Sequence, residues 1–307
     1  MDFTSLFTWV PGPQFLFAQL LNGLTRSMLL FLVSSGLTLI LGVMGVANFA
    51  HGSLYMLGAY GSFTMGTLLG GAPSSFLLAV AVVPLAIALV GGLIERLLLR
   101  RIYEAEGVMQ ILLTYAVVLM VADLVRLIWG PETRGVPKPT VLAGAVTLLG
   151  TIYPSYNLLI LILGPFLAFG LWFLLYHTAF GKVVRATALD REMANALGIN
   201  VPRIFTLVFM LGAWLAGLAG VLTAPIGAIT PTMDLSIIVE SFVVVVIGGL
   251  GSFWGALLGA LIVGVIQAFG ILIVPRMALI SIFAIMALVL ILRPWGLLGN
   301  PRALLAR

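Results

Sequence analysis

Long apolar runs separated by short polar interruptions are the main pattern along this chain. An α-helix needs about 20 apolar residues to cross a bilayer, and the longer runs reach that length. The shorter runs cannot cross alone. The runs lie at residues 22–46, 49–71, 75–98, 108–129, 157–178, 203–224, 235–248, 253–273 and 278–292. This pattern predicts a helical bundle of about eight or nine membrane segments.

The composition indicates a membrane protein as well. Hydrophobic residues make up 62% of the 307 residues and charged residues only 8%, and the mean hydropathy is +1.23. A soluble domain would carry about a quarter of its residues charged. The expected fold class is therefore an all-α integral membrane protein with one transmembrane domain over residues 1–307. Residues 1–21 are expected to lie along the membrane interface before the first span.

Basic residues predict the orientation in the membrane. They cluster at 96–101, within 179–203 and at 293–307, and counting spans puts these groups on one side. The positive-inside rule makes that side cytoplasmic, so the C-terminus and a loop at 179–203 are expected there. Residues 130–156 then form an outer loop. The net charge of +5 comes from these span-flanking residues, so a lipid bilayer rather than nucleic acid is the expected partner.

A polar stretch, GVANFAHGS, interrupts the apolar sequence near the start of the second run. It places Asn48, His51 and Ser53 where each polar group needs a partner away from water. Non-helical backbone at membrane depth is tolerated only where protein or a wet cavity satisfies it, and broken helices build substrate sites or gates in transporters. We expect these three residues and Tyr55 to line a substrate pathway. Structural satisfaction inside the bundle is the alternative.

A second interruption, GGLGS, repeats the pattern of helix, break and helix further along the chain. The sequence thus predicts two glycine-broken helices. Close packing of helices is the alternative explanation for such glycines. The candidate break and gate residues are Gly45, Gly52, Gly248, Gly249 and Gly251.

Glu240 lies inside the apolar run that precedes this second interruption. A lone carboxylate at the bilayer centre costs about 3 kcal/mol, so it should face a pathway or lie at the outer interface. No metal site is expected, because the chain has no cysteine and His51 has no second ligand at suitable spacing.

The loop at 179–203 has the pattern of an amphipathic helix. Ala186, Leu189, Met193 and Leu197 recur at helical spacing between charged residues, and Gly198 ends the pattern. Such a helix either rests on lipid headgroups or inserts its apolar stripe into a groove of a cytoplasmic partner. The candidate docking residues are Arg185, Leu189, Asp190, Glu192, Met193, Ala194, Leu197 and Gly198.

Three segments carry a resemblance to a known family. They read RATALDREMANALGINVPRIFTLVFMLGAWLAGLAGVL, GLTLILGVMGVANFAHGSLYMLGAY and VVVVIGGLGSFWGALLGALIVGVIQAFG. In order and spacing they resemble the branched-chain (LIV-type) amino acid permeases of ABC importers, specifically the LivH-like subunit. Glu192, Ala194 and Gly198 keep the outer spacing of the Glu-Ala-Ala and Gly pattern of such permeases. Met193 stands at the first Ala position, and the distal part of the pattern is absent.

The resemblance implies a permease subunit of a bacterial importer in the inner membrane. The implied partners are a second LivH- or LivM-like permease, two cytoplasmic P-loop ATPases and a periplasmic solute-binding protein. ATP and magnesium would bind to those partners, because this chain lacks the phosphate loop G-x-x-x-x-G-K-[ST]. The chain itself is then expected to be neither an enzyme nor the holder of a cofactor.

Several substrates and one different class stay open at this point. Branched-chain or other hydrophobic amino acids are the expected substrate, with urea, short amides and aromatic or small carboxylates as alternatives within the same machinery. An ion-coupled secondary carrier is the alternative from a different class. It would use buried carboxylates for coupling, and Glu240 is the candidate for that role. A membrane enzyme would need clustered acid, base or metal-binding side chains, which the sequence does not suggest.

Overall fold

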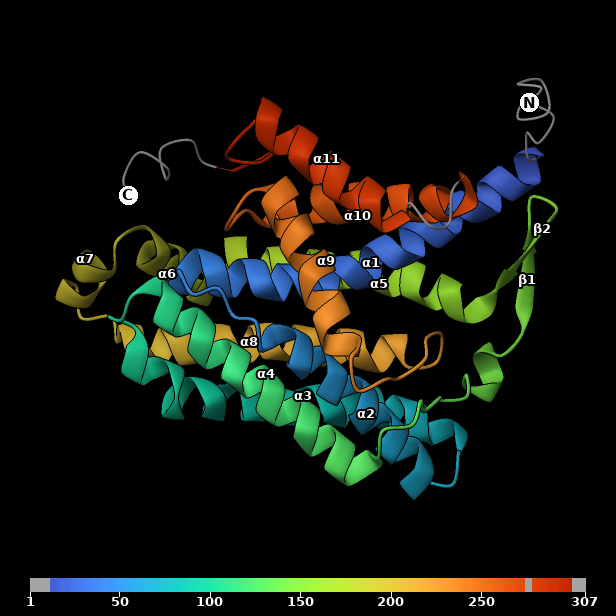
Figure 1. Ribbon diagram of the computed structural model, residues 1–307, viewed down its shortest axis with the longest axis horizontal. Helices are drawn as coiled ribbons and strands as arrows, with labels where there is room; N and C mark the ends of the chain where they lie inside the picture. Colours follow the sequence, from blue (N-terminus) through green and yellow to red (C-terminus); the bar gives the residue numbers. More distant parts are fainter. Residues whose placement is uncertain (1–11, 274–277, 300–307) are drawn as a thin grey trace.

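The computed structural model describes residues 12–273 and 278–299 (Figure 1). Each of the nine predicted apolar runs is largely covered by one helix, and two shorter helices occupy the loop after the fifth of these. The helices within the described residues are α1 (Pro13–Met44), α2 (His51–Leu68), α3 (Pro73–Leu97), α4 (Gly107–Trp129), α5 (Ser155–His177), α6 (Ala179–Leu189), α7 (Arg191–Ala196), α8 (Val201–Thr223), α9 (Met233–Gly248), α10 (Phe253–Ile273) and α11 (Ala278–Leu292). Short 3₁₀ turns occupy Leu99–Ile102 and Thr140–Leu142.

The predicted fold class, a helical membrane bundle, is confirmed. In the described part of the chain, six helices are long and apolar enough to cross a membrane, namely α1, α3, α4, α5, α8 and α10. The helices α2, α9 and α11 are shorter, with 18, 16 and 15 residues. Most of the long helices run side by side in Figure 1, whereas α9 lies steeply across them.

α1 is the central helix of the bundle and packs against α5, α8, α9 and α10. It begins with Pro13, a residue suited to the first helical turn, and continues unbroken through residues 13–21. Its 32 residues span about 48 Å, which exceeds the hydrocarbon thickness of about 30 Å. It ends at Gly45, whose φ of 67° is left-handed and whose N–H donates to the carbonyl of Leu41.

A small β-hairpin forms within the segment expected to be the outer loop. Strands β1 (Ala145–Leu148) and β2 (Thr151–Pro154) pair antiparallel, with Leu148 opposite Thr151. The two turn residues, Leu149 and Gly150, both have positive φ, as the tightest hairpin turns require. The Thr151 hydroxyl donates to the backbone carbonyl of Gln14 at 3.1 Å, so the hairpin is held against the first turns of α1.

The two ends of the bundle differ in chemistry. Figure 1 shows the β-hairpin and the start of α1 at one end and the helices α6 and α7 at the other. Arg96, Arg100 and Arg203 surround one cavity at the α3–α8 junction. Arg191 donates from Nη2 to the carbonyl of Met44 at 2.7 Å, which ties the loop to the end of α1. The basic groups within 96–101 and 179–203 therefore share one end of the bundle.

Glycines allow α8 to lie at the centre of this packing. A methyl group at Gly212 would lie 3.0 Å from the carbonyl of Gly36 on α1. One at Gly217 would lie 2.9 Å from the Cβ of Ile87 on α3. Small residues of this kind permit the close approach on which membrane helices depend. The packing explanation therefore accounts for these central glycines.

Candidate functional site

α2 begins in the middle of the bundle. After Gly45 the chain runs without helical structure, and α2 starts only at His51. His51 lies beside Gly36 of α1, because a methyl group at Gly36 would be 2.9 Å from His51 Cε1 and 2.7 Å from the carbonyl of Gly212. Gly212 is the midpoint of α8. The segment 45–53 therefore becomes helical only from His51 onward, an arrangement typical of discontinuous membrane helices.

α9 also begins beside this point. Its first turn contains Asp234, which is 2% exposed, and Ser53 Oγ donates to Asp234 Oδ2 at 3.2 Å. Gly52 lies directly against the Asp234 backbone, where any side chain would collide. Asp234 Oδ1 accepts the N–H of Leu235 at 2.9 Å. The first turns of two helices, each with a partial positive charge, thus meet around one carboxylate.

Asn48 and His51 bring unsatisfied polar groups to the same region. Both side chains are fully buried. His51 Nε2 lies 2.9 Å from the backbone carbonyl of Val33. His51 Nδ1 and both polar atoms of the Asn48 amide have no hydrogen-bond partner within the described residues. Buried polar groups without a protein partner are typical of places that hold water or a solute.

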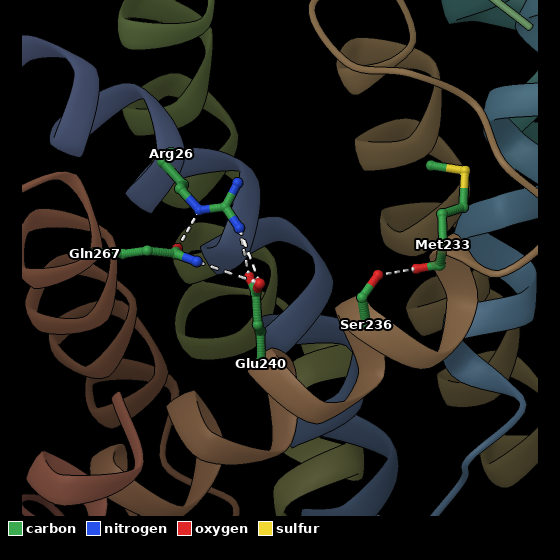
Figure 2. A network of polar contacts seen from close by, with 5 residues as sticks. All are labelled: Arg26, Met233, Ser236, Glu240 and Gln267. Atoms are coloured by element: carbon green, nitrogen blue, oxygen red, sulfur yellow. Dashed lines mark hydrogen bonds and ion pairs between the residues drawn. The ribbon is translucent and has the colours of Figure 1, made fainter. Parts of the chain in front are cut away.

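A polar network links three helices at Glu240 (Figure 2). Arg26 Nη2 on α1 lies 2.9 Å and 2.8 Å from the two carboxylate oxygens of Glu240 on α9. Gln267 on α10 accepts from Arg26 Nε and donates to Glu240 Oε1 at 3.3 Å. The side chains of Arg26 and Glu240 are 44% and 12% exposed. Glu240 is therefore an ion-paired carboxylate rather than a lone one, and the side chain of its partner Arg26 is partly exposed.

Tyr55 is the remaining candidate pathway residue. Its side chain is buried on α2. Its backbone carbonyl faces Gly220 of α8, a position at which a methyl group would collide with it. The first two turns of α2 therefore carry His51, Ser53 and Tyr55, and this part of α2 packs closely against α8.

The candidate gate glycines lie in two neighbouring places. Gly249 and Gly251, with φ of 104° and 77°, form the turn after Gly248 at which α9 ends and α10 runs back against it. This second interruption is therefore a turn between two packed helices. A methyl group at Gly42, one turn before Gly45, would lie 2.7 Å from Gly251 Cα. The two glycine-rich interruptions thus touch at the ends of α1 and α9.

The prediction of one amphipathic helix in the 179–203 loop is wrong, because the loop forms two helices, α6 and α7. Asp190, with φ −151° and ψ 106°, leaves the helical region between α6 and α7. Its carboxylate instead accepts the N–H of Met193 at 2.9 Å and caps the start of α7. Aspartate is among the best residues for that capping position, and this local bond outweighs continuation of the helix.

The apolar residues of this loop face outward even so. Leu189, Met193 and Leu197 are exposed, with Leu189 86% exposed, whereas Ala194 is buried. Gly198 ends the turn after α7 with φ 85°. The loop therefore presents three apolar side chains on the outside of the described structure, beside the exposed Glu192 of α7.

Two arginines attach the loop to the bundle. Arg185 donates to the carbonyl of Leu175, and its guanidinium lies 4.9 Å from the ring centre of Tyr176. Arg191 donates to the carbonyl of Met44, and its guanidinium lies 5.2 Å from the ring centre of Phe205. Met44 is the last residue of α1, so α7 is joined directly to the point where the chain turns back toward His51.

Comparison with known proteins places this arrangement in a family. Residues 19–292 match the family described as branched-chain amino acid transport system / permease component. The chain is 32% identical to the high-affinity branched-chain amino acid transport system permease protein BraD of Pseudomonas aeruginosa, over 92% of this chain and 95% of that protein. It is 31% identical to the corresponding LivH protein of Salmonella typhimurium, over 94% and 97%. It is 29% identical to the probable branched-chain amino acid transport permease LivH of Methanocaldococcus jannaschii, over 89% of each. No solved structure matches the chain.

The fold and these matches together define a multi-pass membrane permease subunit of the ABC importer class. Within that class, the chain belongs to the family of branched-chain amino acid transport permeases. The resemblance read from the three sequence segments is confirmed.

Proposed function

We propose that this chain is half of the transmembrane part of an ATP-driven importer that moves branched-chain or other hydrophobic amino acids across a bacterial inner membrane. The names of the relatives BraD and LivH support this substrate class. The partners would be a second LivH- or LivM-like permease, two cytoplasmic P-loop ATPases and a periplasmic solute-binding protein. ATP and magnesium would be bound by the ATPases, and the C-terminus would be cytoplasmic.

The substrate pathway would pass the polar centre where α2 and α9 begin. Asn48, His51 and Ser53 would contact the solute or its water there, because Asn48 and His51 hold buried polar atoms without a protein partner. Tyr55 and Glu240 would line the path further along. An amino acid carries a carboxylate and an ammonium group, and the pair of Arg26 with Glu240 offers the opposite charge to each.

The observation that carries the proposal is the bond from Arg191 to Met44. The exposed stripe of Leu189, Met193 and Leu197 would dock into a groove of the ATPase, in the helix-in-groove mode. Movement of α7 would then pull on the end of α1 and on Gly45. The chain between Gly45 and His51 would carry that movement to the polar centre, and the turn at 248–252 would follow through its contact with α1.

The test is an uptake assay with the complete importer in proteoliposomes. Arg191→Met should retain the ATPase subunits but lose most ATP-driven uptake, because the link to Met44 is cut. Lys182→Met is the matched control, since Lys182 is an exposed cation of the same loop whose side chain makes no hydrogen bond or ion pair among the described residues. Normal uptake by Arg191→Met would refute the coupling route.

The same preparation tests the substrate and the class of transporter. Labelled leucine, urea and an aromatic carboxylate would be offered with the cognate binding protein, and we expect uptake of leucine. Uptake of urea or of the carboxylate instead would change the substrate class but keep the importer. Uptake driven by an ion gradient without ATP would refute the importer and favour a secondary carrier.

A further inference from the structure

A cavity of about 490 Å³ opens where α3 ends and α8 begins. It lies at the same end of the bundle as α6 and α7 and is separate from the polar centre of α2 and α9. We refer to it as the arginine cavity. Its lining consists of Arg96, Arg100, Asn200, Arg203, Thr206 and Leu207.

The arginine cavity carries uncompensated positive charge. In the described part of the chain, no ion pair includes any of its three guanidinium groups. One carboxylate bonds to the cavity wall: the fully buried Glu95 accepts from the hydroxyl of the lining residue Thr206 at 2.7 Å and from the Tyr103 hydroxyl. Burial and this hydrogen bond raise the pKa of Tyr103, so its hydroxyl stays protonated and remains a donor. Three cations above one carboxylate leave a net charge of about +2, which favours an anion.

The three guanidinium groups and the Asn200 amide give the cavity wall its free hydrogen-bond donors. Asn200 Oδ1 accepts the N–H of Arg203 at 3.1 Å, which leaves the Asn200 NH₂ group free to donate. The Thr206 hydrogen is already given to Glu95, with Pro202 as an alternative acceptor. The planar guanidinium groups offer paired N–H donors that match phosphate oxygens in pairs. The wall is therefore suited to an oxyanion with several acceptors.

An apolar track leads from the arginine cavity into the membrane. Leu93 and Leu97 of α3 lie three residues before Arg96 of the same helix and Arg100 of the 3₁₀ turn that follows, and both leucines are exposed. On α8, the exposed Leu207 lies one turn beyond Arg203 in the same direction. Residues three or four apart share a helix face, so α3 presents Arg96 with Leu93 one turn deeper in the apolar span, and α8 presents Arg203 with Leu207. An acidic patch on a water-soluble partner could bind the arginines but would leave these apolar side chains without a contact.

We propose that the arginine cavity binds the phosphate group of an anionic phospholipid. The phosphate oxygens would lie among Arg96, Arg100 and Arg203 with the Asn200 amide as a further donor, and one acyl chain would follow the exposed leucines. A lipid held there joins the end of α3 to the start of α8. Since α8 follows α7 directly, the lipid would fix one side of the loop that contacts the end of α1.

The first experiment measures lipid retention by the purified chain with native mass spectrometry. The chain would be equilibrated with phosphatidylglycerol or phosphatidylcholine of identical acyl chains. We expect selective retention of phosphatidylglycerol, and a loss of affinity of about tenfold or more in Arg100→Gln/Arg203→Gln, because two charge-assisted donors to the phosphate would be lost. The matched control is Arg101→Gln/Lys182→Gln, which removes the same charge from exposed residues of the same end that do not line the cavity.

The outcomes separate the possible sources of the anion. Equal loss in the control pair, or equal retention of the two lipids, would overturn the proposal, because the attraction would then be non-specific. Competition by inorganic phosphate at the same arginines would point to a soluble anion and overturn the lipid assignment. If the assembled importer excluded the lipid and the arginine variants lost their ATPase subunits, the cavity would be a protein contact instead. Circular dichroism melting would confirm that both variants fold.

Discussion

Gly36→Ala tests the close three-way contact of α1, α2 and α8 at the polar centre. The added methyl group would lie 2.7 Å from the carbonyl of Gly212 and 2.9 Å from His51 Cε1. Ordinary contact begins at 3.4 Å, so α1 and α8 would have to separate by about 0.7 Å. Neither the backbone nor the ring of His51, which is bonded to Val33, can yield freely. Overpacking of this kind costs about 1–3 kcal/mol, more than the gain of about 0.5–1 kcal/mol from replacing a helical glycine.

The assay is thermal unfolding of the purified chain in detergent, followed by uptake in the reconstituted importer. We expect a melting temperature several degrees below wild type and a reduced rate of uptake. Gly170→Ala is the control, because Gly170 also lies inside a helix of the bundle but a methyl group there meets no atom within 4 Å. That variant should be at least as stable as wild type. If Gly36→Ala were as stable as Gly170→Ala, the three helices could not cross as closely as described.

Three further predictions concern the ion pair, the start of α9 and the loop. Arg26→Gln should lower the free energy of unfolding by about 1–3 kcal/mol, because the Glu240 carboxylate loses its ion-pair partner. The double variant Arg26→Gln/Glu240→Gln should recover most of this stability in thermal melts. Equal losses in the single and double variants would show that the two side chains are not coupled. Asp234→Ala should cost about 1–3 kcal/mol in the same melts, because the buried Ser53 hydroxyl and the partly buried N–H of Leu235 lose their acceptor. An unchanged melt would contradict the bonded geometry. Met193→Glu should abolish ATPase copurification without changing the melt, whereas Leu149→Glu, exposed in the hairpin turn, should not; retention of the ATPases by Met193→Glu would exclude this docking face.

The helical fold could be predicted from the sequence because hydropathy acts locally. Each apolar run became a helix, since backbone groups in an apolar environment must bond within their own segment. The errors are also local. The carboxylate of Asp190 accepts the N–H of Met193, and this bond separates α6 from α7 within a sequence pattern that predicted one helix. The β-hairpin depends on the positive φ of Leu149, a conformation that leucine rarely adopts and that the sequence therefore did not suggest.

The candidate site could be predicted only in part. The polar groups of Asn48, His51 and Ser53 were conspicuous because they interrupt apolar sequence. Their surroundings were not, since Asp234 lies 181 positions from Ser53, and such a pairing leaves no periodic signal. The same holds for Arg26 and Glu240, which are 214 positions apart. One signal was available: an acidic residue directly before an apolar run is typical of a helix start, and Asp234 has that position.

The contacts at the end of α1 explain why the two glycine-rich interruptions should move together under the proposed function. Arg191 donates to the carbonyl of Met44, and Gly42, two residues earlier, lies so close to Gly251 that not even a methyl group fits between them. A movement of α7 that presses the end of α1 toward Gly251 would therefore displace the turn between α9 and α10 as well. Since α9 carries both Asp234 and Glu240, and the segment after Gly45 leads to His51, one movement of the loop would reach the polar centre from both sides.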